Sequence, residues 1–205
     1  MVDVSLTAAT HPGIHALLCG ALNQTAGAYG EMSIAVGEPA LYLSDGTDLV
    51  LPDAEPGFVV GGSMEMRGGV SGRAVLLFRP TAARHLLEVL MGPGANGPSA
   101  REDTVRIGPH HVTALLEVVT ITLSAVCKAI GDYLGHQTER GEPQVLVGYG
   151  EAVVQSVLGA VAAGPGHCLV AVMPFASGSQ ELEGSLAIVL DERSLERLLA
   201  GMGAA

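Results

Sequence analysis

The chain has 205 residues, of which 48% are hydrophobic and only 15% charged. This composition favours one compact globular domain over a disordered chain. Ten Lys and Arg residues against 21 Asp and Glu residues give a net charge of −11, which repels phosphate backbones and anionic lipid surfaces. Neither nucleic acid nor a membrane is therefore expected as a partner.

The amino-terminal segment and the cysteines favour a cytoplasmic protein. Residues 1–22 carry no positive cluster ahead of their apolar stretch, so a secretory signal is not expected. No uninterrupted apolar run reaches the roughly 20 residues that span a bilayer. Cys19, Cys127 and Cys168 lie in apolar segments without CxxC or CxxH spacing, which favours reduced core thiols over a metal or redox role.

The first half of the chain predicts an amphipathic helix, a strand, a β-hairpin and a short helix. Apolar residues at helical spacing indicate the helices, and alternating or β-rich runs bounded by glycine indicate the strands. Pro80 ends the second hairpin strand, Thr81 is expected to cap the next helix, and Gly92 is expected to stop it. In chain order the predicted elements are residues 14–29, 40–43, 58–67, 71–79 and 81–91.

The second half predicts the same kinds of element after a linker rich in glycine and proline, residues 93–108. Its first helix has the strongest helical periodicity in the chain, with apolar residues repeating at steps of three, one and four. A strand, a helix, two further strands and a closing helix follow. In chain order the predicted elements are residues 110–134, 144–149, 151–163, 168–176, 181–190 and 193–201.

The order of elements suggests an internal duplication. The run Gly72–Phe78 followed by a Leu-Leu pair matches the run Gly184–Leu190 followed by another, at an offset of 112 residues. Chance coincidence of such common residues is the alternative. The duplication predicts an α/β fold of the α+β sandwich type, with pseudo-twofold symmetry and helices on a mostly antiparallel sheet. Residues 1–205 then form a single domain with repeats at about 11–92 and 109–203.

Most familiar catalytic motifs are absent from the sequence, including GxGxxG, GxxxxGK[ST], HExxH and GxSxG. His11 and His15 are four residues apart, but the intervening Pro-Gly interrupts the helix that would align them. His110 and His111 begin a predicted helix, where a solvated or capping role is the more common one. For both pairs a structural role is favoured over metal binding, and no metal site is expected.

One face of the helix at 110–134 carries a polar stripe. Thr113, Glu117, Thr120, Ser124 and Lys128 follow one another at steps of three or four, opposite the apolar face. On periodicity alone, a solvated helix face is the favoured explanation. The stripe alone therefore leaves open whether these side chains form a binding site.

A family resemblance bears on this choice. Residues 113–130, TALLEVVTITLSAVCKAI, resemble the signature helix of the CheC, CheX and FliY phosphatases of bacterial chemotaxis. The pattern of that helix is Asp or Ser, three residues, Glu, two residues and Asn. The first predicted helix, ALLCGALNQTAGAYGEM, resembles the first copy of the motif, and GSLAIVLDERSLERLLAGMG resembles the family's closing segment. The resemblance covers nearly the whole chain and matches the duplication.

The second copy of the motif falls on Thr113, Glu117 and Thr120, so the hydroxyl and the acid are kept while Thr replaces Asn. The resemblance implies that Glu117 pairs with a lysine of the receiver and that Thr120 occupies the place of a water-orienting amide. Because a hydroxyl is shorter than a carboxamide, weak or no turnover is expected at this copy. Thr113 and Ser124 are expected to contact the partner.

The first copy falls on Ala16, Gly20 and Asn23, so the Asn is kept while the hydroxyl and the acid are missing. The resemblance implies that Asn23 orients the attacking water without its acidic neighbour. Ala16 and Gly20, with Gly27, also form a surface of small residues that suits close approach by a partner. Ordinary helix packing within this protein explains those small residues equally well.

The resemblance leaves two functions open. In the first, the protein is an enzyme that hastens hydrolysis of the aspartyl phosphate on a CheY-type receiver, where the receiver carries Mg²⁺ and this chain needs no cofactor. In the second, it is a binding module that holds a receiver, a CheD-like deamidase or a flagellar switch component without chemistry. Both place the protein in bacterial chemotaxis signalling in the cytoplasm.

Overall fold

The computed structural model describes residues 57–95, 107–161, 168–177 and 182–194, with shorter stretches at 16, 19–21, 34–37, 40–44, 105 and 196–197. The elements follow the chain in the order β1 (Ile34–Val36), β2 (Ala40–Ser44), β3 (Phe58–Gly68), β4 (Gly72–Phe78), α2 (Pro80–Met91), α3 (Pro109–Leu134), β5 (Thr138–Arg140), β6 (Gln144–Tyr149), α4 (Gly150–Val161), β7 (Cys168–Ser177) and β8 (Glu183–Leu190).

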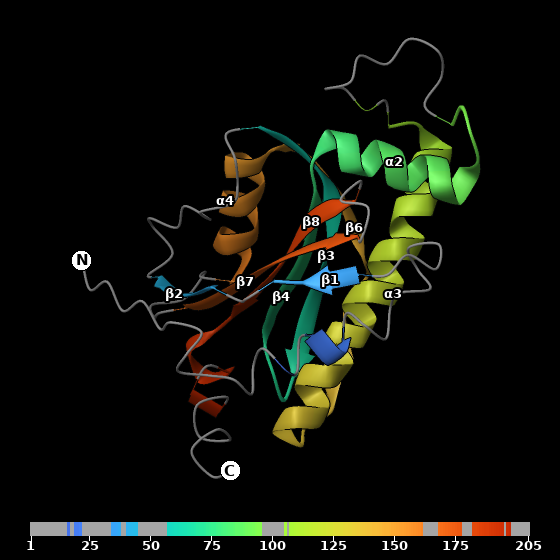
Figure 1. Ribbon diagram of the computed structural model, residues 1–205. Helices are drawn as coiled ribbons and strands as arrows, with labels where there is room; N and C mark the ends of the chain where they lie inside the picture. The colour runs from blue at the N-terminus through green and yellow to red at the C-terminus, as the bar shows by residue number, and fades with distance from the viewer. Residues whose placement is uncertain are drawn as a thin grey trace.

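The strands form one antiparallel sheet between two helical layers. Their order is β1-β7-β8-β4-β3-β5, with β2 also pairing with β7 and β6 also pairing with β3. Helices α2 and α3 cover one face of the sheet and α4 lies on the other (Figure 1). The α+β class and the antiparallel sheet expected from the sequence are thus confirmed.

The alternation of side chains along each strand divides the core into two layers. On β4, Ala74 and Leu76 point into the cluster under α2 and α3, whereas Val75 and Leu77 point into the cluster under α4. The strands of the sheet centre are therefore apolar on both faces. Such burial accounts for their nearly continuous runs of apolar residues.

Helix α3 is a core helix of this fold. Its length and composition alone would allow it to cross a membrane, but half of its most apolar stretch is buried inside the protein. Leu115, Leu123 and Val126 are fully buried against the sheet. Close packing there depends on Gly62 of β3, where an added Cβ would lie 2.5 Å from Cγ2 of Val119.

Three local features differ from the expectation or were missed. Pro80 is the first residue of α2, with Arg79 as the N-cap, so the prediction that Thr81 caps this helix is wrong. Proline suits that first position because the amide it lacks has no partner within the helix. The short strands β1 and β5 were not predicted, since three residues are too few to show a period.

The pairing of β4 with β8 bears on the duplication. Val75 faces Ala187, which lies 112 residues later, while Gly72 faces Leu190 and Phe78 faces Gly184. A local twofold axis through the central pair would give this register. The duplication itself, and the single domain with repeats at 11–92 and 109–203, stay predictions.

The described cysteines are core thiols, as expected. Cys127 and Cys168 are buried, Cys19 is partly buried, and none forms a disulfide. Burial raises the pKa of the Cys127 thiol to about 12 and also raises that of Cys19. A thiol with a raised pKa is a poor nucleophile and a poor metal ligand at neutral pH.

A candidate binding surface on α3

The start of α3 is held by His111. Gly108 is the N-cap, and its backbone N–H donates to Nδ1 of His111 over 3.0 Å. The other ring nitrogen, Nε2, lies 2.9 Å from the carbonyl oxygen of Ala95, which follows α2. Because Nδ1 accepts, Nε2 carries the proton and donates. His111 therefore has the capping role favoured by the sequence, and it ties the beginning of α3 to the end of α2.

The polar stripe divides along its length. Thr113, Glu117 and Thr120 are exposed on the outer face of α3, away from the sheet. Ser124 is half-buried, and its hydroxyl donates toward Sδ of Met64 on β3 over 4.0 Å. The exposed surface suited to a partner is therefore centred on Glu117, and Ser124 lies at its margin.

The two threonines use their hydroxyl protons within the helix. Oγ1 of Thr113 donates to the carbonyl oxygen of Pro109 over 3.2 Å, and Oγ1 of Thr120 donates to that of Leu116 over 2.5 Å. Such bonds to the carbonyl four residues earlier are a common way for a helix to satisfy these hydroxyls. In this conformation each oxygen can accept a hydrogen bond from a partner but cannot donate one.

Glu117 is the charged centre of this surface. Among the described residues its carboxylate has neither an ion pair nor a hydrogen bond. The lysine of the same stripe, Lys128, pairs with Asp132 instead, one turn further along the helix. The negative charge of Glu117 is thus available to a cation on another molecule.

An apolar side chain that the sequence reasoning missed lies beside Glu117. Ile121 is 44% exposed, although it is part of a long apolar helix. It follows Glu117 by four residues and therefore neighbours it on the helix surface. Its position outside the buried apolar periodicity was the signal that could have identified it. The outer face of α3 thus carries one unpaired charge and one exposed apolar side chain side by side.

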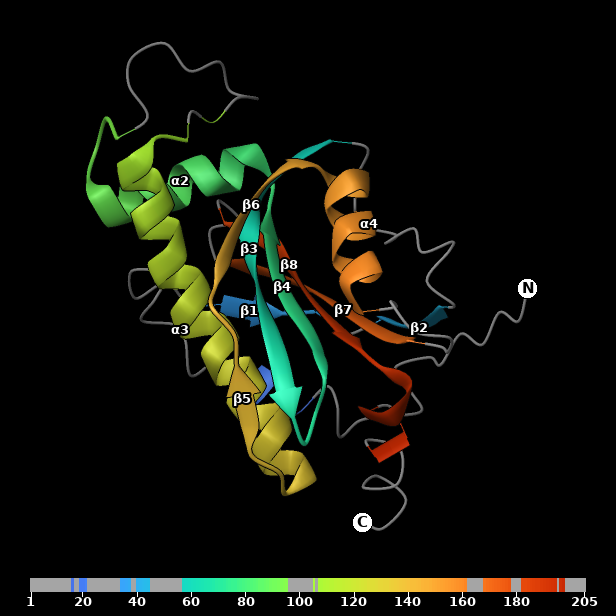
Figure 2. The same cartoon turned by 180° about the vertical axis from the view of Figure 1, so that it is seen from behind.

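The first copy of the motif is described only in part. Ala16 and Gly20 are helical and exposed, while Ala21 is buried in the same core cluster as α3. The helical residues 19–21 lie beside α3 in both views (Figures 1 and 2). Asn23 and Gly27 fall outside the described residues. At Gly20 an added Cβ would meet no atom within 4 Å, so that surface is open.

Comparison with known proteins identifies this fold through solved structures alone. No protein-family model and no curated protein matches the chain. Among solved structures, FliY from Thermotoga maritima superposes with a TM-score of 0.71 at 15% identity, covering 100% of this chain and 99% of that one. The chain has the CheC/CheX/FliY-like fold. The resemblance found in the sequence is therefore confirmed at the level of the fold.

Two further structures show how broadly the CheC/CheX/FliY-like fold is used. FliM in complex with SpeE, from H. pylori, gives a TM-score of 0.62 at 14% identity, covering 96% of this chain and 94% of that one. CheX in a complex with CheY, BeF3 and Mg²⁺, from Borrelia burgdorferi, gives 0.51 at 14% identity, covering 86% and 96%. At such identities the likeness shows the fold, and the roles of Glu117, Thr120 and Asn23 stay predictions.

Proposed function

We propose that this protein is a cytoplasmic chemotaxis protein that binds a CheY-type receiver through the exposed outer face of α3. The observation that carries the proposal is the unpaired, exposed carboxylate of Glu117 with Ile121 beside it. A lysine of the receiver would pair with Glu117 while Ile121 contributes apolar contact. The complex of CheX with CheY among proteins of this fold supports the choice of partner.

Binding is proposed to be the main activity, and hydrolysis of the receiver's aspartyl phosphate a weak one. Hydrolysis requires a water molecule aligned with the phosphorus atom, so the catalyst mainly positions that water. Thr120 offers one acceptor oxygen on a side chain shorter than an amide, and its proton is already bonded to the carbonyl oxygen of Leu116. Asn23 is the remaining amide, and Gly20 leaves it without a neighbouring acid. Mg²⁺ would be supplied by the receiver.

A titration with receivers tests the binding. The CheY-type receivers encoded in the same genome are purified, treated with BeF3 and Mg²⁺, and titrated into the protein. Because the protein has no tryptophan, an attached fluorescent label or calorimetry reports complex formation. Glu117→Ala is expected to weaken binding about tenfold, as loss of an interface charge pair does. Glu151→Ala, which removes an exposed carboxylate on α4 across the sheet, is the matched control. Failure of every receiver to bind, or equal binding by both variants, contradicts the proposal.

Decay of the phosphorylated receiver tests the chemistry separately. Thr120→Asn restores the amide of the second copy at an exposed position, and Gly20→Glu restores the acid of the first copy at an open one. Each variant is expected to accelerate decay beyond the wild-type protein by at least tenfold. If wild type already accelerates decay strongly and Asn23→Ala abolishes the effect, the protein is an active phosphatase at the first copy.

A non-catalytic module of the flagellar switch is the second candidate. FliM in complex with FliG, from H. pylori, has this fold with a TM-score of 0.53 at 14% identity. The damage to both motifs favours such a role over catalysis. A CheD-like deamidase is a further candidate partner. Binding to purified switch proteins or to such a deamidase, with no binding to any receiver, would favour these alternatives.

A further inference from the structure

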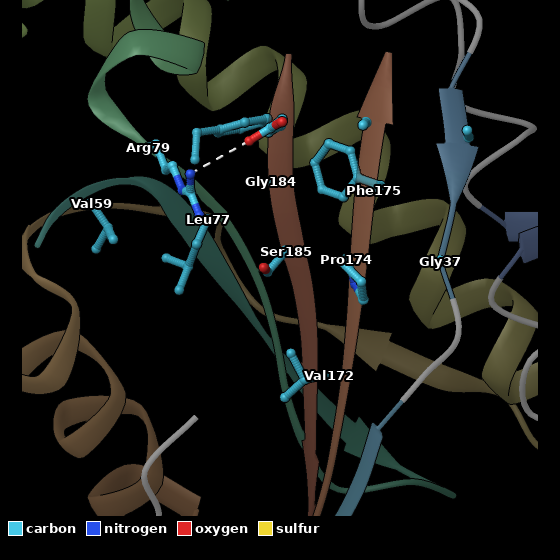
Figure 3. Close-up of a pocket in the computed structure, with 13 residues that line it drawn as sticks. Gly37, Val59, Leu77, Arg79, Val172, Pro174, Phe175, Gly184 and Ser185 are labelled. Carbon is cyan, nitrogen blue, oxygen red and sulfur yellow. Dashed lines mark ion pairs between the residues drawn. The ribbon is translucent and has the colours of Figure 1, made fainter. Parts of the chain in front are cut away.

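Strand β6 forms an open edge of the sheet. It pairs with β3 along one side, and no described strand pairs with its other side (Figure 2). With six residues it is longer than β1, β2 and β5, the other described strands at the margins. The opposite margin is interrupted, because Gly37 separates β1 from β2 and donates its N–H to the carbonyl oxygen of Pro174 on β7 over 2.8 Å (Figure 3). Sheet edges are commonly protected by charged residues or proline, and β6 contains neither.

The register shows which backbone groups of β6 point out of the sheet. Gly150 lies opposite Gly57 and donates its N–H to the carbonyl oxygen of that residue over 2.9 Å. Because bonded and non-bonded pairs alternate along an antiparallel ladder, every second residue of β6 bonds to β3 and the residues between them direct N–H and C=O outward. The outward residues are Val145, Val147 and Tyr149. None of their backbone groups has a partner in the described part of the chain, so this edge can accept a further strand.

The side chains along this edge form an exposed apolar row. Val147 is 44% exposed and Tyr149 is 69% exposed, and the ring of Phe58 on β3 lies 5.8 Å from that of Tyr149 between centroids. Val147 faces Val60 of the core cluster under α2 and α3, so the row is on that face of the sheet. An added antiparallel strand would place every second side chain directly beside the row. A short extended segment with apolar residues at alternate positions therefore fits the edge.

The charges around the edge favour a cationic segment. Residues 138–151 carry three exposed carboxylates, of Glu139, Glu142 and Glu151, and one exposed guanidinium, of Arg140. Glu142 and Glu151 flank β6 at its two ends, and neither has an ion pair or a hydrogen bond among the described residues. A second copy of the chain would bring the same acids and a further net charge of −11 to this edge, which disfavours pairing between two copies. We propose that β6 binds an extended segment of a partner protein that alternates apolar and polar residues and has Lys or Arg at its ends.

Two isomeric peptides test the pairing. Each is a blocked eight-residue peptide with lysine at both ends and alternating valine and threonine between them. The probe is N-methylated at its threonines, so that only its valine edge can bond to β6 and it cannot stack on itself; the control is N-methylated at its valines. In ¹⁵N-labelled protein the probe is expected to shift the amide signals of Val145, Val147 and Tyr149 and to slow their hydrogen exchange about tenfold at saturation. No shift with the probe, or equal binding by the two isomers, overturns the proposal.

Charge changes test the choice of partner. Replacing both lysines of the probe by glutamate should weaken binding about fivefold, and Glu142→Gln should reduce that difference about twofold. Glu151 is left unchanged because its charge also favours the first turn of α4. Glu192→Gln is the control, since this exposed acid follows β8 and the strands β4 and β3 lie between β8 and β6. Equal affinity for the lysine and glutamate peptides overturns the cationic partner. Sedimentation as a dimer that the probe does not dissociate would show instead that a second copy occupies the edge, and would also overturn the proposal.

Discussion

Replacing Gly62 by Ala is expected to destabilise the protein, because α3 packs tightly against β3 at this glycine. An added Cβ would lie 2.5 Å from Cγ2 of Val119 and 2.7 Å from the carbonyl oxygen of Gln144. The valine is β-branched within a helix and has little rotamer freedom, and the carbonyl belongs to the strand paired with β3. Overpacking of this kind costs about 1–3 kcal/mol, and removing a strand glycine returns about 0.5–1 kcal/mol. We expect a net loss of about 2 kcal/mol.

Urea unfolding, monitored by circular dichroism, measures this loss in the free energy of unfolding. Val119→Ala removes the methyl groups that clash, so the combined variant should lose at least about 1 kcal/mol less than the sum of the two single variants. Gly20→Ala is the control, since its Cβ meets nothing within 4 Å and a helical alanine should gain up to about 1 kcal/mol. A Gly62→Ala variant as stable as wild type, or strictly additive effects, would refute the packing argument.

Three further results are expected from the described contacts. Cys127, with its pKa raised to about 12, should resist alkylation at pH 8 until the protein unfolds, whereas the partly buried Cys19 should react first; equal rates in folded protein would contradict this. His111→Ala removes two hydrogen bonds at the start of α3 and should cost about 1–2 kcal/mol in urea unfolding, and no loss would mean that water replaces them. Arg67 donates to Glu65 and lowers the pKa of that carboxyl. This stabilisation is present above the ordinary carboxyl pKa and is lost as the pH falls through the lowered value. Glu65→Gln should therefore lose slightly less stability than wild type between pH 7 and pH 3, and parallel losses would contradict the assignment.

Sequence reasoning predicted the long elements well because burial leaves a clear period in them. The helix expected at 110–134 is α3, and the hairpin expected at 58–79 is β3 and β4. Short edge strands such as β5 were missed because only their pairing with β3 defines them. The cap of α2 was placed at Thr81 because its side chain suits that role. The helix instead begins at Pro80, whose missing amide N–H leaves one group fewer to be capped.

The candidate site was less predictable than the fold. The exposure of Glu117 and Thr120 followed from helical periodicity, but the bond from the Thr120 hydroxyl to the carbonyl oxygen of Leu116 depends on a rotamer that no sequence pattern records. Ile121 was missed because an apolar residue in an apolar helix draws no notice until its exposure is known. The role of Asn23 lies outside the described residues and stays a prediction.

The pairing of β4 with β8 also has a consequence for how the chain folds. The two strands are neighbours at the centre of the sheet, yet more than half of the chain separates them. During synthesis the β4 edge of the hairpin of β3 and β4 therefore stays unpaired after β5 and β6 have covered the β3 edge, and the apolar helix α3 has only part of its sheet to cover. β8 is synthesised after β3 to β7 and completes the centre of the sheet and not its margin. A chain truncated before β8 would therefore lose its structural middle and expose apolar surface that promotes aggregation.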